Sequence, residues 1–163
     1  MYYNNIGNKD LVPESSKQLN LGLNGAFKTS WVSQFYYSLN SYYGEIDEKI
    51  IAVPTQNLFV WSMQNIGKVT NYGLEFSGVF NSKPIWKNSW VDLNYAYTLQ
   101  LVKDRSDKNK GTYNQQIIYT PHEISNVRVT PHLNSRFSIY WNLQFIGHQF
   151  YLPENIYENL IDE

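Results

Sequence analysis

The chain has 163 residues, a formal net charge of -1 and a pI near 6.3. It therefore lacks the concentrated positive charge with which proteins bind nucleic acids. It contains no cysteine, which excludes disulfides and thiolate chemistry. The longest hydrophobic runs span residues 50–53 and 58–61 and are too short for a transmembrane helix. Aromatic residues reach 17%, a share that suits a membrane-interface girdle, a glycan-binding surface or a Tyr-rich core.

The first third of the chain predicts two strands between polar segments. Residues 1–16 are polar and predict a loop. Alternation of apolar and polar residues predicts a strand over 19–27. After a short connection at 28–30, the same alternation predicts a second strand over 34–40. Residues 42–56 are predicted to form a longer loop.

The clearest pattern lies between residues 65 and 101 and predicts one long hairpin. In its first strand, Leu74 and Phe76 share an apolar face and Glu75 lies on the other face. The return strand, 91–101, alternates without interruption. Its length matches the roughly 9 to 11 residues with which a tilted strand crosses a bilayer, whereas globular strands usually have about 5 to 6. The sequence therefore predicts antiparallel strands of a transmembrane β-barrel.

The last third predicts two more strands. Residues 102–115 form a charged stretch that is typical of a solvated loop. A fifth strand is predicted over 117–130, followed by a tight turn at 131–134. The sixth strand, over 136–145, alternates as clearly as the strand before the charged loop. Residues 151–163 predict no recognisable element.

The expected connections alternate between short and long, as they do in outer-membrane barrels with short periplasmic turns and long extracellular loops. Strands one, three and five would then descend, and both chain ends would lie outside. The residues predicted to face lipid are Phe35, Tyr37, Leu39, Leu74, Phe76, Val91, Leu93, Tyr95, Tyr97, Leu99, Phe137, Ile139, Trp141, Leu143 and Phe145. Those predicted to face the lumen are Glu75, Asp92, Asn94, Thr98, Arg136, Asn142 and Gln144. Ligand contacts are expected from the long loops, where the candidates are Tyr42, Tyr43, Tyr113 and Tyr119.

Three short stretches stand out beside the strand pattern. The first is Gly7-Asn8 followed by Leu11, Pro13, Glu14 and Ser15. The second is Asn65-Ile66-Gly67 followed by Gly73-Leu74-Glu75. The third is Tyr119-Thr120-Pro121-His122 with Gly147 and Tyr151 in the strand after it. In this order and inside strands of this length, they resemble the C-terminal barrel of TonB-dependent outer-membrane receptors over nearly all of residues 7–153.

The resemblance implies a receptor in the outer membrane of a Gram-negative bacterium. Its family members are barrels of about 22 strands with a plugged lumen. They import scarce nutrients such as siderophores, cobalamin or glycans, with energy from a TonB complex that acts on the plug. About six strands are too few for a closed barrel, and no plug-like segment is visible. We therefore expect residues 1–163 to be part of a larger receptor, with lipid, the TonB complex and an unidentified nutrient as partners. The start of the chain lacks a signal-peptide pattern, so an exported protein would have a longer precursor.

Two alternatives remain open from the sequence. The aromatic content also suits a soluble antiparallel β-sandwich that binds glycans, because a sandwich strand alternates as well. If Leu93, Tyr95, Tyr97 and Leu99 pack against a second sheet, the sandwich is favoured, and if no part of the protein covers them, lipid does. A plugless diffusion porin is the second alternative, which these residues do not separate from the receptor.

Neither catalysis nor a cofactor is predicted. His122 and His132 are ten residues apart on one expected strand, roughly 33 Å at strand rise, so they cannot share a metal ion. His148 is expected one strand away, near His122, but no third ligand is placed beside them. Glu75 is expected to pair with a cation in the lumen rather than to act as a general acid or base. No nucleophile, base and orienting group can be assembled from the pattern.

Overall fold

The computed structural model describes residues 4–55, 60–150 and 158–159. Among these residues every regular element is a strand, which confirms the all-β prediction. The strands are β1 (Asn4–Ile6), β2 (Ser15–Phe27), β3 (Val32–Asp47), β4 (Ile50–Pro54), β5 (Val60–Asn65), β6 (Val69–Ser82), β7 (Trp90–Asp104), β8 (Glu123–Asn134), β9 (Phe137–Ser138), β10 (Trp141–Ile146), β11 (Gln149–Phe150) and β12 (Glu158–Asn159). The described part of the chain has no helix that could cross a membrane.

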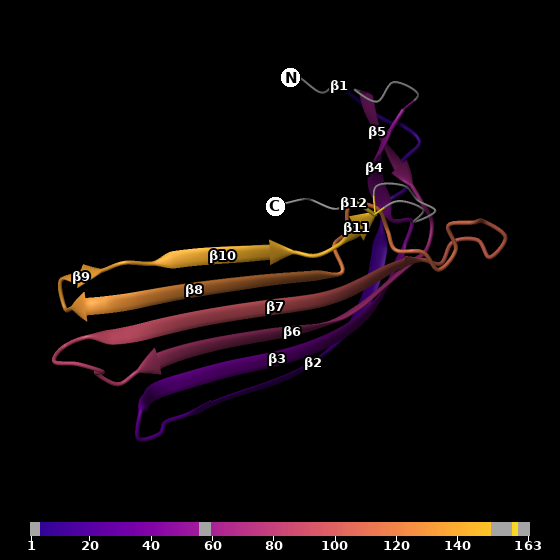
Figure 1. Cartoon of the computed structure of the whole chain (residues 1–163). Helices are drawn as coiled ribbons and strands as arrows, with labels where there is room; N and C mark the ends of the chain where they lie inside the picture. Colours follow the sequence, from indigo (N-terminus) through magenta and orange to yellow (C-terminus); the bar gives the residue numbers. More distant parts are fainter. Residues whose placement is uncertain (1–3, 56–59, 151–157, 160–163) are drawn as a thin grey trace.

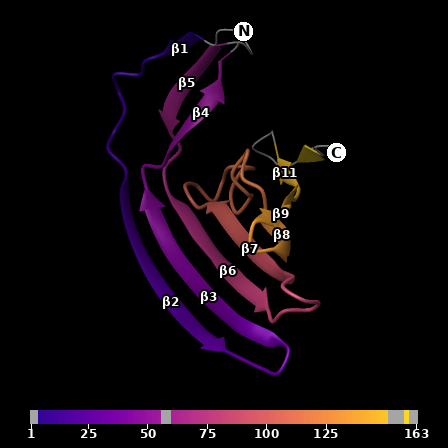
Figure 2. The ribbon, with the colours of Figure 1, turned by 90° about the vertical axis from the view of Figure 1, so that its left-hand side faces the viewer.

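One curved antiparallel sheet makes up most of the structure. Its strand order is β10-β8-β7-β6-β3-β2, with β9 paired to β8, so each long strand lies beside its neighbour in the sequence (Figures 1 and 2). β3 has 16 residues and β7 has 15, well beyond the usual globular length. This length confirms the expectation of strands long enough to cross a bilayer. The sheet is open, and its edges are β2 and β10 among the described strands.

The connections are short at one end of the sheet and long at the other (Figure 1). The short ones are residues 28–31, 83–89 and 135–136. The long ones are residues 48–68 and 105–122. The predicted alternation of connection lengths is therefore present in the structure.

A second, small sheet projects from the end that carries the long connections (Figure 1). It has the order β1-β5-β4, with β4 and β5 forming a hairpin inside the connection between β3 and β6. β1 pairs with β5 in the parallel sense, although most of the chain's other pairs are antiparallel. β1 thereby lies against β5, which follows it by more than 50 residues.

The end of the second strand was placed wrongly by the sequence pattern. Residues 42–56 were expected to form a loop, but β3 continues to Asp47, paired with β2 up to Asp47 and with β6 up to Ile46. Beyond Tyr43, Glu45 and Asp47 put polar side chains on the face that is apolar further down the strand. Ile46 lies on the opposite face, so the alternation of the lower part of β3 does not continue in phase and the pattern that marks the strand is lost.

The boundaries of the fifth strand were also wrong. β8 begins at Glu123 rather than at residue 117 and continues to Asn134, so the turn predicted at 131–134 lies at 135–136 instead. The Asn134 side-chain oxygen accepts the backbone N–H groups of Arg136 and Phe137 and holds this turn. Pro131 is tolerated within β8 because its partner strand is interrupted between β9 and β10.

Candidate functional site

The register of the large sheet separates its side chains onto two faces. Residues directly opposite each other on neighbouring antiparallel strands share a face. One row consists of Leu23, Leu39, Phe76, Tyr97, Ser125 and Phe145. The adjacent row on the other face consists of Gly22, Asn40, Glu75, Thr98, Ile124 and Ile146. We call these the apolar face and the polar face.

Most of the residues predicted to face lipid share the apolar face. They are Phe35, Tyr37, Leu39, Leu74, Phe76, Val91, Leu93, Tyr95, Tyr97, Leu99, Trp141, Leu143 and Phe145. β2 and β8 extend this face with Leu19, Leu21, Leu23, Phe27, Val127 and Val129. Leu21 is 75% exposed and Leu143 is 70% exposed, so apolar side chains lie uncovered at both edges of the sheet. Phe137 and Ile139 lie at the irregular junction of β8, β9 and β10.

The polar face collects six of the seven residues predicted to face the lumen. They are Glu75, Asp92, Asn94, Thr98, Asn142 and Gln144. Arg136 lies in the turn between β8 and β9 and belongs to neither face, because the strand begins one residue later than predicted.

An unpredicted cluster lies on the polar face at the end with short connections. The Asp92 carboxylate accepts a hydrogen bond from the Asn81 side-chain amide at 2.8 Å and lies 2.9 Å from His132 Nε2. The His132 ring stacks on Trp90 with 4.3 Å between ring centroids. Asp92 is thereby held by partners on both neighbouring strands. Sequence reasoning missed the cluster because its residues come from three strands that only the sheet register brings together.

The four candidate ligand tyrosines do not form one group. Tyr42 and Tyr43 lie within β3 on opposite faces, so their assignment to a loop is wrong. The Tyr43 hydroxyl donates to Glu45 at 3.1 Å. Tyr113 and Tyr119 do lie in the connection between β7 and β8. The Tyr119 ring packs at 5.9 Å from Trp61 of β5, and so joins the two long connections.

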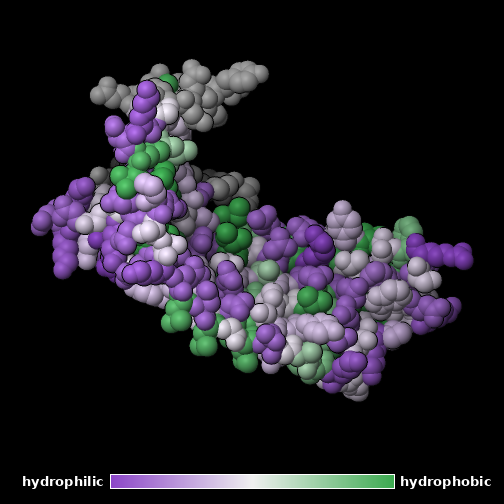
Figure 3. All heavy atoms as spheres, turned by 180° about the vertical axis from the view of Figure 1, so that it is seen from behind, coloured by the Kyte–Doolittle hydropathy of each residue, from purple (hydrophilic) through white to green (hydrophobic). Residues whose placement is uncertain are grey.

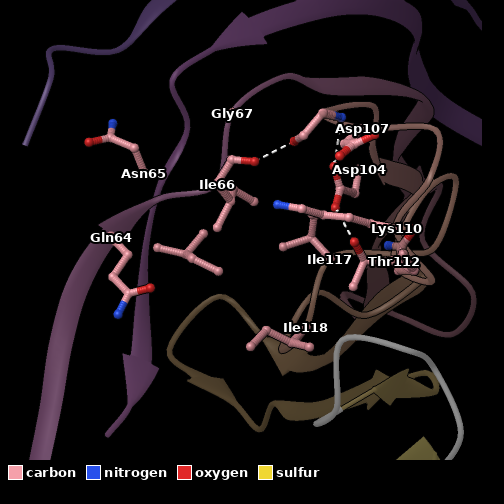
Figure 4. A pocket seen from close by; sticks show the side chains of 13 residues that line it. Gln64, Asn65, Ile66, Gly67, Asp104, Asp107, Lys110, Thr112, Ile117 and Ile118 are labelled. Atoms are coloured by element: carbon pink, nitrogen blue, oxygen red, sulfur yellow. Dashed lines mark hydrogen bonds between the residues drawn. The ribbon is translucent and has the colours of Figure 1, made fainter.

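A pocket of about 530 Å³ lies between these two connections (Figure 4). Its apolar lining is Ile51, Ile66, Ile117 and Ile118, and its polar lining includes Gln64, Asn65, Asp104, Ser106, Asp107, Lys110, Thr112 and Gln116. The pocket thus offers an apolar floor with hydrogen-bonding groups around it, the combination that binds small polar–apolar molecules.

Hydrogen bonds within the protein hold the polar wall of the pocket. The Asp104 carboxylate accepts the Ser106 N–H at 2.8 Å and the Thr112 hydroxyl at 2.7 Å. The Ser106 hydroxyl donates to the Ile66 carbonyl and so links the connection to the segment before β6. Gln116, which is buried, accepts the Val102 N–H at 3.0 Å. These groups shape the pocket, and sequence reasoning missed them because they lie in a stretch whose charged composition predicts only a solvated loop.

The first two stretches behind the family resemblance meet beside this pocket. The Asn65 side chain accepts the Val12 N–H and donates to the Val12 carbonyl, both at 2.9 Å, and also donates to the Glu48 carbonyl at 2.6 Å. Asn8 donates to the Met63 carbonyl at 2.9 Å. These amides tie residues 8–12 to the β4–β5 hairpin. Their observed role is to join chain segments.

Two charged groups near the long connections have shifted pKa values. The Ile50 N–H donates to the Glu14 carboxylate and lowers the pKa of Glu14, and Lys49, 3.2 Å away, acts in the same direction. Glu45, with its carboxylate 2.7 Å from the ammonium group of Lys68, raises the pKa of Lys68. Both charged groups therefore stay ionised over the physiological range.

His122 and His148 lie close together, and His132 lies apart from them, as the sequence indicated. The His122 N–H donates to the His148 carbonyl at 3.2 Å, while His132 is near the other end of β8. Among the described residues, no three His, Cys, Asp or Glu side chains come together in a way that would hold a metal ion.

The long strands, their two contrasting faces and the segregation of their connections define this class of protein as an outer-membrane β-barrel. The family model described as TonB dependent receptor-like, beta-barrel matches residues 1–159, and the chain belongs to that family. This is a family of transport receptors of the Gram-negative outer membrane and not a family of enzymes. A search of the curated proteins finds no significant match.

Proposed function

We propose that this chain forms part of the barrel wall of a receptor that imports a nutrient across the outer membrane with energy from TonB. The observation that carries the proposal is the uncovered apolar face. The small sheet projects from the end of the large one (Figure 1), so among the described residues no second sheet covers Leu93, Tyr95, Tyr97 and Leu99, and Leu99 is 37% exposed. Lipid is the remaining apolar medium for this face, and the soluble sandwich has no support from the described residues.

The open edges support a larger barrel. β2 and β10 leave rows of backbone N–H and C=O groups without a strand partner among the described residues. Such groups are costly in lipid, so a membrane sheet closes into a barrel. We infer that further strands complete the wall, and that the plug and its TonB contacts come from parts of the receptor outside this sheet. The polar face then lines the lumen.

The long connections would lie outside the cell, and the short ones would face the periplasm. In this orientation the pocket between residues 64–67 and 104–118 lies at the outer mouth of the barrel. We propose this pocket as a contact site for the nutrient, which would be of the siderophore, cobalamin or glycan class. Its support is the combination of isoleucine side chains with fixed amide and hydroxyl groups.

A cysteine scan of β7 in the assembled receptor tests the proposed membrane strand. This chain adds no cysteine of its own, so single substitutions at residues 91–101 can be labelled selectively once the rest of the receptor is cysteine-free. We expect Val91, Leu93, Tyr95, Tyr97 and Leu99 positions to react only with a lipid-soluble thiol reagent in intact outer membranes. The Asp92, Asn94 and Thr98 positions should react only with a water-soluble reagent that enters the lumen. Protection of the apolar positions from both reagents would show a protein core and overturn the proposal.

A further inference from the structure

Charged side chains on the apolar face of the large sheet are confined to the end with long connections. Lys17, Glu45, Thr70 and Lys103 lie in register across β2, β3, β6 and β7. The next row on the same face consists of Leu19, Tyr43, Tyr72 and Leu101. The change from leucine and tyrosine to charged residues on β2, β3 and β7, and to a threonine on β6, therefore takes place within one step along each strand. In Figure 3 hydrophilic residues surround the long connections, and others lie along the sheet and at its opposite end.

Two more cations join this row. Arg105 Nε donates to the Thr70 hydroxyl at 3.4 Å, which places the guanidinium beside the row. Lys68 Nζ lies 2.7 Å from the Glu45 carboxylate. We call Lys17, Lys68, Lys103 and Arg105 the rim cluster. Neighbouring strands are about 4.8 Å apart, so the cluster spans roughly 14 Å from β2 to β7.

The charge of the rim cluster exceeds that of the carboxylates beside it. Its four cations face two carboxylates on the same side of the sheet, Glu45 and Asp47, so a net charge of +2 remains. Glu45 is already bound to Lys68 and to the Tyr43 hydroxyl. Glu123, further along this face on β8, accepts the Tyr97 hydroxyl at 2.9 Å. The region around Lys17, Lys103 and Arg105 is therefore suited to an anion.

We propose that the rim cluster binds the phosphate groups of an anionic lipid in the outer leaflet, whose acyl chains lie on the apolar face below it. The proposal rests on the proposed function, because it takes the apolar face as the lipid-facing face and the long connections as the outer end. Lysine and arginine side chains bury their apolar stems and keep their charge at the interface, where they attract anionic headgroups.

The rows beneath the cluster favour a lipid over a free anion. Tyr43 and Tyr72 lie directly below the charged row, and tyrosine is suited to the boundary between headgroups and acyl chains. Leu19, 74% exposed, and Leu21, 75% exposed, continue the apolar surface toward the middle of the strand. One phospholipid-like molecule would thus match the charge of the cluster and the apolar surface below it at once.

Substitution of the rim cluster in the assembled receptor tests the proposal. The test variant is Lys17→Gln, Lys103→Gln and Arg105→Gln. The matched control removes the same charge at the other end of the sheet with Lys83→Gln, Lys87→Gln and Arg136→Gln. Retention of diphosphorylated lipid A by the purified receptor is measured by native mass spectrometry, with phosphatidylcholine as the zwitterionic comparison.

We expect the rim variant to bind lipid A at least about tenfold more weakly than the control variant, since three cations near the headgroups are removed. Phosphatidylcholine retention should not change. Equal lipid A binding by the two variants would overturn the proposal, and so would displacement of lipid A by millimolar inorganic phosphate, which would indicate a site for the free anion.

Two further measurements keep the result interpretable. The first is lipid A binding by the double variant Lys17→Gln/Lys103→Gln, which leaves the Arg105–Thr70 contact intact. The second is heat-modifiable electrophoretic mobility, which reports whether each variant is folded. The double variant should still show several-fold weaker lipid A binding. The cysteine scan of β7 is run on the same receptor. If the labelling of β7 alternates but the rim variant binds lipid A as well as the control variant does, only the proposed headgroup site is refuted. If the labelling does not alternate, the proposed function itself is refuted.

Discussion

A positive charge at the middle of the apolar face should destabilise the folded barrel strongly. Leu39 lies halfway between Phe35 and Tyr43, the ends of the apolar stretch of β3. At about 3.3 Å per residue, each end is roughly 13 Å away along the strand, and about 9 Å away along the membrane normal for a strand tilted by about 45°. The Leu39→Arg substitution therefore places a guanidinium near the bilayer midplane. Its expected cost is about 2–4 kcal/mol.

Two matched variants separate the cost of placing a charge deep in the bilayer from the cost of introducing an arginine side chain into the strand. Ser77→Arg places the same charge on the polar face of the neighbouring strand at a similar height, and should cost below about 1 kcal/mol. Tyr43→Arg lies at the outer end of the apolar stretch, where about 0–1 kcal/mol is expected. The free energy of unfolding is measured by urea titration of the assembled receptor in lipid vesicles. Equal costs for Leu39→Arg and Ser77→Arg would refute the assignment of the apolar face to lipid.

Three further predictions concern the long connections. Asn65→Asp removes the amide that donates to the Val12 and Glu48 carbonyls, so residues 8–12 should lose about 1–3 kcal/mol of local stability and exchange their amide hydrogens faster. An unchanged exchange rate would contradict this role of Asn65. The hydrogen bond from the Ile50 N–H lowers the pKa of Glu14, so its contribution to stability is present above the unfolded pKa and is lost as pH falls through the lower folded pKa. Protection of the Ile50 amide from hydrogen exchange, relative to its intrinsic rate, should therefore fall on acidification below the unfolded pKa, but not in Glu14→Gln. Gly67 has a φ of 86°, and an added Cβ would lie 2.9 Å from the Ser106 Cβ. Gly67→Ala should therefore lower the local stability by more than about 1 kcal/mol and increase proteolysis of residues 105–122, and Ser106→Gly should partly reverse both effects.

The strand ends show why the sequence pattern predicted the two faces of the large sheet but misplaced the ends of β3 and β8. Alternation over 91–101 is explicit because one face meets an apolar medium and the other meets water, and β7 follows it. At Glu45 and Asp47 the apolar face becomes charged while Ile46 lies on the other face, so the earlier alternation ends and β3 continues through pairing that composition does not reveal. Pro131 is a turn residue by composition, yet it lies within β8 because the facing strand is interrupted.

The candidate site likewise contains features that local sequence predicts and features that only the fold reveals. The sequence by itself determined the all-β class, the two-faced strands, the rhythm of short and long connections and the family, because each depends on local periodicity or on short motifs. Only the tertiary structure decided that Tyr42 and Tyr43 point to opposite faces and that Trp61 meets Tyr119. It also decided that Lys17 and Lys103 lie in one row, since they are separated by two intervening strands. Such contacts depend on strand register and on loop packing, which hydrogen bonds between distant segments fix and no local pattern encodes.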